Sequence, residues 1–462
     1  MKNKNQFTLW VLAWPIFIET FLQFLLGAAD TLMVSSISDD AVAVVGFSNQ
    51  LFNGLYVLFQ AIAGGAGILI AQKLGAREER DARSISILAL QLVAAIAVVF
   101  SIVLALKPLW FAKLLRYPVE LYGLAEIYIS IVGGGALLVA MMFALSTVIR
   151  NTGNTKGPML VAIGMNVIHV ILNYGFIYGE LGLPQLGLTG VAISTNISRV
   201  LGVAVLFVMF VHAFESRIRF SEFFKRVEGR LLRAVLKISW PLGAGGGSWV
   251  YSQIVIFSFI AQLGAKELAA RTYMNTLESF CFMLGWAIAL AVQIQIAHLF
   301  GAGLRDEAYR GAYRALWIGL AVVAVNALIL IPLGEPVLSF FTDDGEIVAM
   351  GVALLMLNAV LQPGKMINMA MTNALNAVGD TRYPMVVGLI VMWSIAVGLS
   401  WYLGLHLGWG LVGIYICMIL DEYVRGFVIF LRWKGQRYLR RSETETEAAA
   451  GPAPLPKEIA EA

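Results

Sequence analysis

The sequence predicts an all-α polytopic membrane protein, with twelve transmembrane helices in two six-helix lobes that are related by a parallel internal repeat. Three observations support this prediction. Hydrophobic residues make up 59% of the 462 residues and charged residues only 13%, against about 25% charged in soluble domains. Apolar runs of roughly 20 residues, long enough to cross a ~30 Å hydrocarbon core as helices, recur along the chain. A set of residues also recurs at a constant offset.

The apolar runs define the predicted spans in order. They cover residues 9–36, 43–72, 85–106, 121–149, 157–179, 188–213, 234–263, 270–299, 312–333, 346–375, 384–406 and 409–431. Barrel strands would be shorter and would alternate in polarity, so helices are expected. Several spans exceed the minimum length, which predicts tilted or kinked helices.

An internal repeat relates the two halves of the chain. The stretch RNTGNTKGPMLV at 150–161 returns, altered, as NAVGDTRYPMVV at 376–387, so Pro158 and Pro384 are 226 positions apart. The same ungapped offset matches Trp14 with Trp240, Asn49 with Asn275, Ile70 with Ile296, and Gly75 with Gly301. A duplication explains these matches. Each copy holds six spans, an even number, so both copies enter the membrane in the same direction, as in transporters built from two parallel halves.

The repeat also sets the predicted boundaries. The first lobe is 1–214, a basic cytoplasmic linker is 215–233, the second lobe is 234–435, and a disordered cytoplasmic tail is 436–462. In the repeated turn, Gly153 and Gly379 are expected to end one helix, and Pro158 and Pro384 to start the next. We therefore interpret this turn as structural.

The basic residues orient the protein in the membrane. With the N-terminus inside, 24 of the 33 Lys and Arg fall in cytoplasmic segments and five in external ones, where Arg271 is counted. This asymmetry predicts a multi-pass protein of the cell membrane with both termini in the cytoplasm. The net charge of +4 then reflects topology, and no nucleic-acid partner is expected.

Polar residues inside the spans are costly in lipid, so we expect them to face the bundle interior and to mark function. The first-lobe stripes are Glu19, Gln23 and Asp30; Asn49, Asn53 and Gln60; Asn166, His169 and Asn173; and Ser194, Thr195 and Arg199. In the second lobe, Gln362, Lys365, Asn368 and Thr372 form a basic stripe, with Glu278 as the expected partner of Lys365. Interhelical hydrogen bonding, at ~0.6 kcal/mol each, is the alternative for the amides. For His169, packing and proton handling both stay open.

Asp30 is the strongest functional candidate. It lies about six turns into the first span, and no basic residue shares its face. A carboxylate in this setting can bind and release a proton, which would rearrange its hydrogen bonds to neighbours such as Asn173 and Thr195 and bias a two-state helix packing. A carboxylate also attracts Na⁺, so either ion is compatible with Asp30.

The motifs WPIFIETFLQFLLGAADTLMVS, GNTKGPM, NYGFIYG, GLTGVAISTNISR and GDTRYPM resemble the multidrug and toxic compound extrusion (MATE) family over residues 10–435. The resemblance implies two six-helix lobes and efflux of cationic, often aromatic drugs driven by H⁺ or Na⁺. It places Asp30 at the family's first-span coupling aspartate, Thr195 at a polar position of the sixth span, and Asn173 where members have aspartate or asparagine. His169 departs from an expected asparagine.

The second lobe departs further from the family pattern. Lys365 takes the place of an acidic residue used by one branch, and Trp249 falls near a span-seven glutamate of that branch. The resemblance is therefore closer to the branch that couples through the N-terminal lobe. The repeat agrees with this reading, because Asp30 has Ile256 as its equivalent in the second lobe.

These observations predict a secondary active multidrug antiporter that exports cationic or amphiphilic organic compounds in exchange for H⁺ (or Na⁺) by alternating access, with Asp30 as the coupling carboxylate. The predicted coupling site contains Asp30, Asn173, Thr195 and His169. The substrate-cavity candidates are Gln23, Asn49, Asn53, Gln60, Glu278 and Lys365. The expected partners are small organic cations and membrane lipids, and the chain is expected to be a monomer.

The alternatives come from other functional classes. A flippase or exporter of a lipid-linked or amphiphilic metabolite would need a basic cavity, for which only Lys365 and Arg199 are candidates. A membrane enzyme is disfavoured, because the spans carry no HExxH, no GxSxG and no metal-ligand cluster. No catalytic residue, metal or cofactor is expected beyond the coupling ion.

Overall fold

The computed structural model describes residues 8–115, 117–214, 222–223 and 228–436, so the predicted tail and most of the predicted linker lie outside the described residues. The described residues contain helices and no strand. The first lobe comprises α1 (Leu9–Ser35), α2 (Asp39–Gly75), α3 (Glu79–Leu106), α4 (Pro108–Leu114), η2 (Val119–Leu121), α5 (Tyr122–Gly134), α6 (Ala136–Asn151), α7 (Lys156–Tyr178) and α8 (Leu188–Val211). The second lobe comprises α9 (Gly229–Leu263), α10 (Ala265–Gly301), α11 (Arg305–Phe341), α12 (Gly345–Ala377), α13 (Arg382–Val391), η4 (Met392–Leu399), η5 (Trp401–His406) and α14 (Gly410–Lys434).

Each predicted span corresponds to one helix or to one interrupted helix. Within the described ranges, eleven helical stretches are long and apolar enough to cross a membrane. The twelfth, α14, has the length but carries Asp421, Glu422 and Arg425 near its middle. The fourth span is interrupted at Gly135, between α5 and α6, and the eleventh passes from α13 into the π-helical turns η4 and η5. The predicted all-α fold is confirmed.

The repeated turn has the predicted geometry in both lobes. Gly153 and Gly379 have φ values of 92° and 86°, in the left-handed region that glycine adopts most easily. The helices before the turn end at Asn151 and Ala377. The next helices begin five residues later in each case, with a proline in the first turn, so the duplication is preserved residue by residue at this point.

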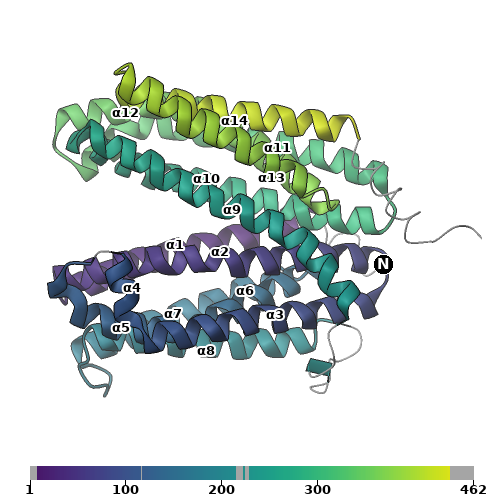
Figure 1. Ribbon diagram of the computed structural model, residues 1–462, viewed down its shortest axis with the longest axis horizontal. Coiled ribbons are helices and arrows are strands. Elements are labelled where there is room, and N and C mark those ends of the chain that lie inside the picture. The colour runs from purple at the N-terminus through teal and green to yellow at the C-terminus, as the bar shows by residue number, and fades with distance from the viewer. Residues whose placement is uncertain (1–7, 116, 215–221, 224–227, 437–462) are drawn as a thin grey trace, which may run out of the picture.

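Figure 1 shows α1 to α8 in one bundle and α10 to α14 in the other, with α9 running obliquely from beside α3 to the second bundle. Helices α1 and α2 of the first lobe contact α9 and α10 of the second. One apolar core spans this interface, where Leu12 and Ile16 of α1 belong to the same buried cluster as Ile294 and Ala297 of α10. The two lobes are therefore held together by burial of apolar surface as well as by the chain connection.

Two equivalent hydrogen bonds join the lobes at the end of the molecule where α2 and α10 finish, which we call the closed end. Gln72 Nε2 donates to the carbonyl oxygen of Ala377 at 2.6 Å, and His298 Nε2 lies 2.7 Å from the carbonyl oxygen of Asn151. Gln72 and His298 are 226 positions apart, and so are Asn151 and Ala377. The two bonds are thus copies related by the repeat, and we call them the twin latch.

Two glycines let the helices cross closely at this latch. A Cβ added to Gly75 would collide with the carbonyl oxygen of His298, and one added to Gly301 would collide with the carbonyl oxygen of Gln72. Gly75 and Gly301 are themselves repeat equivalents. Only a residue without a side chain permits this approach of two backbones.

The lobes separate toward the opposite end, where α2 begins and α9 finishes, which we call the open end. Helix α2 lies close to α9 at three successive turns: Val57 faces Gly246, Ala61 faces Gly243, and Gly65 faces Ser239. Asn53 and Gln50 lie on the same face of α2 as Val57, one and two turns nearer the open end, and both are exposed. The face that α9 covers near the closed end is therefore accessible near the open end.

Candidate functional site

The first-lobe site is centred on Asp30, which lies five residues before the end of α1 in the half of the lobe nearer the open end. Its side chain is 26% exposed. Helix α1 packs against α7, whose His169 and Asn173 are one turn apart on the facing surface. His169 Nε2 lies 2.7 Å from Asp30 Oδ1, and Asn173 Nδ2 donates to the same oxygen at 2.9 Å. Three predicted coupling residues are thus brought together.

Helix α8 completes this site through Ser194 rather than Thr195. Ser194 Oγ donates to Asn173 Oδ1, whereas Thr195 Oγ1 donates to the carbonyl oxygen of Val191 in its own helix. In this conformation the Thr195 hydroxyl donates to its own helix rather than to Asp30, as a threonine within a helix can, so its place in the coupling site stays a prediction. Asn173 Nδ2 also lies 3.1 Å from His169 Nε2, so Asp30, His169 and Asn173 form one closed triangle.

Fixed and titratable groups surround this triangle. Tyr128 of α5 is buried and interacts electrostatically with both Asp30 and Arg199. The Arg199 Nη1 is buried without a hydrogen-bond partner. Nearer the closed end, Glu19 of α1 pairs with Arg150 of α6 at 3.1 Å. Glu19 therefore has a cationic partner, whereas Asp30 has an imidazole and an amide.

The amide residues proposed for the substrate cavity are accessible. Gln23 of α1 and Asn49, Asn53 and Gln60 of α2 are all exposed. Asn53 shares the face of α2 that meets α9 nearer the closed end, as described above. Asn49 and Asn53, one turn apart on α2, therefore offer hydrogen-bond donors and acceptors on the first-lobe wall between the lobes.

Glu278 and Lys365, the other two cavity candidates, form the expected pair but with partners that sequence reasoning missed. Lys365 Nζ lies 3.5 Å from Glu278 Oε2. Glu278 Oε1 is 2.9 Å from Arg271 Nη1 and also accepts from the Tyr415 hydroxyl at 2.9 Å. Arg271 is only 2% exposed, which corrects its assignment to an external loop. A basic residue beside a predicted span end was counted as external, although α10 begins at Ala265 and carries it inside the lobe.

A second group of charges continues this network toward α14. Asn368 Nδ2 donates to Glu422 Oε2 at 2.7 Å, and Glu422 pairs with Arg425 at 3.0 Å. Arg425 Nε also donates to Asp421 Oδ1 at 3.0 Å. Together with Arg271, Glu278 and Lys365, these groups give three cations and three carboxylates, so the described second-lobe network is formally neutral.

An aromatic row borders the second-lobe network. Trp249 of α9 stacks on Phe282 of α10, with ring centroids 6.3 Å apart, and Phe282 stacks on Trp286 at 6.2 Å. All three rings are partly exposed. Trp286 shares its face of α10 with Gln293 and Ala297, which are buried nearer the closed end. The row therefore lies on the interlobe side of α10. The spacing of Phe282 and Trp286, i and i+4, is a sequence signal that could have indicated that these two rings share one face of the helix.

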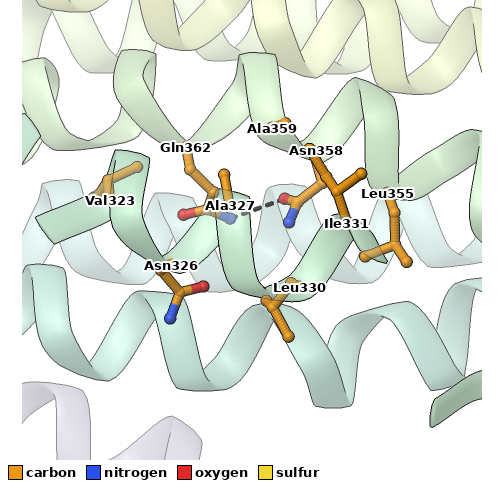
Figure 2. Close-up of a pocket in the computed structure, with 9 residues that line it drawn as sticks. All are labelled: Val323, Asn326, Ala327, Leu330, Ile331, Leu355, Asn358, Ala359 and Gln362. Carbon is orange, nitrogen blue, oxygen red and sulfur yellow. Dashed lines mark hydrogen bonds between the residues drawn. The ribbon is translucent and has the colours of Figure 1, made fainter. Parts of the chain in front are cut away.

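A small cavity lies between α11 and α12, lined by Asn326, Asn358 and Gln362 together with apolar side chains (Figure 2). Gln362 Nε2 donates to Asn358 Oδ1 at 2.8 Å, the bond drawn in Figure 2. The cavity volume of about 10 Å³ is close to the room needed by one water molecule. It is therefore too small for an organic substrate.

Among the residues that the structure describes, no group of three or more His, Cys, Asp or Glu side chains is arranged to hold a metal ion. The Asp30 site contributes one carboxylate, one imidazole and one amide. These three groups can form hydrogen bonds, and two of them are of a type that can bind a proton.

Comparison with known proteins agrees with this architecture. The MatE family model matches residues 15–175 and 248–402 of the chain. The chain is 33% identical to the "Uncharacterized transporter YisQ" of Bacillus subtilis over 94% of its length and 95% of that protein. It is 26% identical to the "Probable multidrug resistance protein NorM" of Thermotoga maritima over 94% of each chain.

Solved structures of similar fold extend over almost the whole chain. A mutant of the Vibrio cholerae MATE transporter VcmN superposes with a TM-score of 0.86 at 18% identity, covering 94% of this chain and 96% of that one. A MATE structure in the straight conformation gives a TM-score of 0.84 at 19% identity and covers 95% and 96% of the two chains. The two family-model segments fall one in each lobe and account for more than half of the residues. The chain therefore belongs to the MATE family, whose members are membrane transporters rather than enzymes.

Proposed function

We propose that this protein is a secondary active efflux antiporter that exports cationic or amphiphilic organic compounds in exchange for protons. The observation that carries the proposal is the Asp30 site, where a partly exposed carboxylate is held by His169 and Asn173 inside a membrane-spanning lobe. Names of relatives such as NorM, described as multidrug resistance proteins, support the substrate range. Na⁺ is the alternative coupling ion.

The proposed mechanism couples protonation of the Asp30 site to the arrangement of the lobes. In the conformation described, the twin latch and the Gly75 and Gly301 contacts join the lobes at the closed end, and the open end is accessible. A change of charge at Asp30 alters the bonds between α1 and α7, and α1 also packs on α10 of the other lobe. Protonation can therefore bias a two-state packing of the lobes, as alternating access requires.

The proposed substrate surface has an amide wall and an aromatic wall. Asn53 and its neighbours on α2 supply hydrogen bonds, while Trp249, Phe282 and Trp286 supply ring faces that attract organic cations. Glu278 is buried in ion pairs and would not contact substrate in this conformation. A flippase for a lipid-linked anion is less well supported, because Lys365, one of the two basic candidates, already pairs with Glu278.

The proposed orientation places the closed end and both termini in the cytoplasm of a cell whose plasma membrane holds the protein, acting as a monomer. The distribution of Lys and Arg supports this orientation. The latch would then block the cytoplasmic side while the substrate surface faces outward.

The proposal is tested with purified protein in proteoliposomes, with fluorescent organic cations as substrates and pH or Na⁺ gradients imposed separately. Asp30→Asn is expected to reduce proton-driven transport to the level of empty vesicles, because an amide does not take up and release a proton in the way that a carboxylate does. Asp306→Asn, a matched change at an exposed site in the first turn of α11, should leave transport unchanged. Full proton-driven transport by Asp30→Asn would exclude Asp30 as the coupling residue.

A further inference from the structure

We propose that the exchanged proton is shared between Asp30 Oδ1 and His169 Nε2, and that His169 makes this site selective for protons over Na⁺. This inference rests on the proposed antiport and extends it to a specific atom pair. His169 is one of four histidines in the chain and is 3% exposed. The tautomer of a histidine is set by its hydrogen bonds, and its Nε2 faces a carboxylate oxygen at 2.7 Å.

The separation of 2.7 Å requires a proton between the two atoms. Without one, a lone pair of the ring nitrogen would face a lone pair of the carboxylate oxygen. Asp30 carries the exposed part of the pair, with 26% of its side chain accessible against 3% for His169. We therefore expect the proton to be taken up and released through the carboxylate, from water on one side of the membrane in one packing of the lobes and to water on the other side in the alternative packing. In the loaded state one hydrogen joins Oδ1 and Nε2 while Nδ1 of His169 carries its own hydrogen. On release Nδ1 keeps that hydrogen, so the ring is neutral, Asp30 is a carboxylate, both Oδ1 and Nε2 become acceptors and the direct bond is lost.

Asn173 is placed to stabilise the released state. Its Nδ2 lies 2.9 Å from Asp30 Oδ1 and 3.1 Å from His169 Nε2, and an amide nitrogen carries two hydrogens. Once the shared proton leaves, these hydrogens can be donated one to each acceptor as Asp30 and His169 move apart. Loss of the proton thus converts a direct contact between α1 and α7 into one mediated by Asn173.

The surrounding charges are compatible with release. Tyr128 of α5 interacts electrostatically with Asp30, and also with Arg199 of α8, Tyr56 of α2 and Tyr117. Arg150 of α6 lies nearer the closed end, where it is paired with Glu19 of α1. Arg199 supplies a permanent positive charge, and its Nη1 has no hydrogen-bond partner. After release the pair has a charge of −1, which the Arg199 cation offsets in part through space.

The same geometry disfavours Na⁺. Alkali and other hard cations are held by oxygen atoms, and a ring nitrogen occupies one side of the Asp30 carboxylate. The Asn173 Oδ1 already accepts from Ser194, and the Thr195 hydroxyl is turned to Val191. An asparagine in place of His169 would restore a carbonyl oxygen at this position.

Nuclear magnetic resonance tests the position of the proton directly. The protein in lipid nanodiscs, labelled with ¹⁵N in the histidine rings, is titrated between pH 5 and 8, and His169→Asn assigns the signal by its disappearance. We expect Nε2 of His169 to change from protonated to unprotonated as the pH rises, and addition of Na⁺ to leave its shift unaltered. An Nε2 that stays protonated over the whole range would make His169 a passive donor and would overturn the proposal.

Transport provides the second readout. His169→Asn is expected to lower proton-driven transport by roughly ten- to hundredfold, the worth of one charge-assisted hydrogen bond. His212→Asn, the same change at an exposed position that ends α8, should retain the wild-type rate. If Asp30→Asn abolishes transport and His169→Asn does not lower it, the shared-proton proposal fails and the antiport proposal stands. If Asp30→Asn transports normally, the antiport proposal fails, whatever the histidine signal shows.

Discussion

The two lobes descend from one repeat, but their buried polar groups lie at different positions. Asp30, His169 and Asn173 of the first lobe correspond, at the 226-residue offset, to Ile256, Ile395 and Leu399. The second-lobe residues Arg271, Glu278 and Lys365 correspond to Val45, Phe52 and Val139. At these six positions one lobe is therefore apolar where the other is polar, although the backbone turns and the latch are shared.

The clusters differ in charge balance as well as in place. The Asp30 side chain is 26% exposed and has no permanent cation in hydrogen-bond contact, whereas the Glu278 side chain is 5% exposed and contacts both Arg271 and Lys365. A site that must gain and lose a proton needs access to water and a charge that is free to change. A fully paired buried network resists such a change, because removing one charge leaves the others uncompensated. We therefore propose ion exchange for the first lobe and a structural role for the second-lobe network.

Breaking the second-lobe network should give the largest stability effect. Arg271→Met leaves Glu278 with Lys365 at 3.5 Å as its remaining cationic partner, and such a loss costs about 3–5 kcal/mol for buried pairs. We expect a lower thermal unfolding temperature for the purified protein in nanodiscs. The matched control is the triple variant Arg271→Met, Glu278→Leu, Lys365→Met, which removes all three charges and should recover most of the lost stability. A triple variant that folds like the wild type but no longer transports would show that the second lobe takes part in coupling.

Much of the difference between the two lobes can be predicted from the sequence. The remaining contacts cannot, and the reasons are physical. The offset of 226 identified the two lobes, and the spacing of His169 and Asn173 put both on the face that meets Asp30. The Lys365–Glu278 pair followed from opposite charges in neighbouring stripes. The ion pair of Arg271 with Glu278 could not be predicted, because a count of basic residues does not distinguish a residue outside the end of a span from one buried against a carboxylate. The bond made by Thr195 could not be predicted either, because a hydroxyl in a helix can donate to its own backbone or to a neighbouring side chain.

For the twin latch, the sequence indicates only which residues are equivalent and not which contacts they make. The repeat aligns Gly75 with Gly301. The close approach at each glycine, however, is to a carbonyl oxygen of the other lobe. A contact with a backbone atom cannot be predicted from a sequence pattern, because every residue has the same backbone. The same holds for Gln72 and His298, which differ in chemistry while making the same type of bond. Contacts of a side chain with a distant main-chain atom therefore had to come from the structure.

The close crossing at the latch predicts the next largest effect. Gly301→Ala places a methyl group against the carbonyl oxygen of Gln72, so the lobes must move apart at the closed end, at a cost of about 1–3 kcal/mol to this conformation. Spin labels on either side of the closed end should report a longer distance in the variant. Gly311→Ala, on α11 with its nearest atom 3.9 Å away, is the control and should leave the distance unchanged. Gly75→Ala should match Gly301→Ala, and a clear difference between them would show that the lobes are not equivalent at this end.

The hydrogen bonds of the latch predict the smallest effect and test the symmetry most closely. Gln72→Leu and His298→Leu each remove one donor to a helix-end carbonyl, and each should cost the closed arrangement about 1 kcal/mol. The same spin-label distances measure the shift, and the double variant should shift them further than either single variant, since the two bonds join different pairs of helices at one crossing. If His298→Leu alone opened the closed end while Gln72→Leu did nothing, the latch would be a single histidine contact. The asymmetry between the lobes would then extend from the ion site to the interface on which they move.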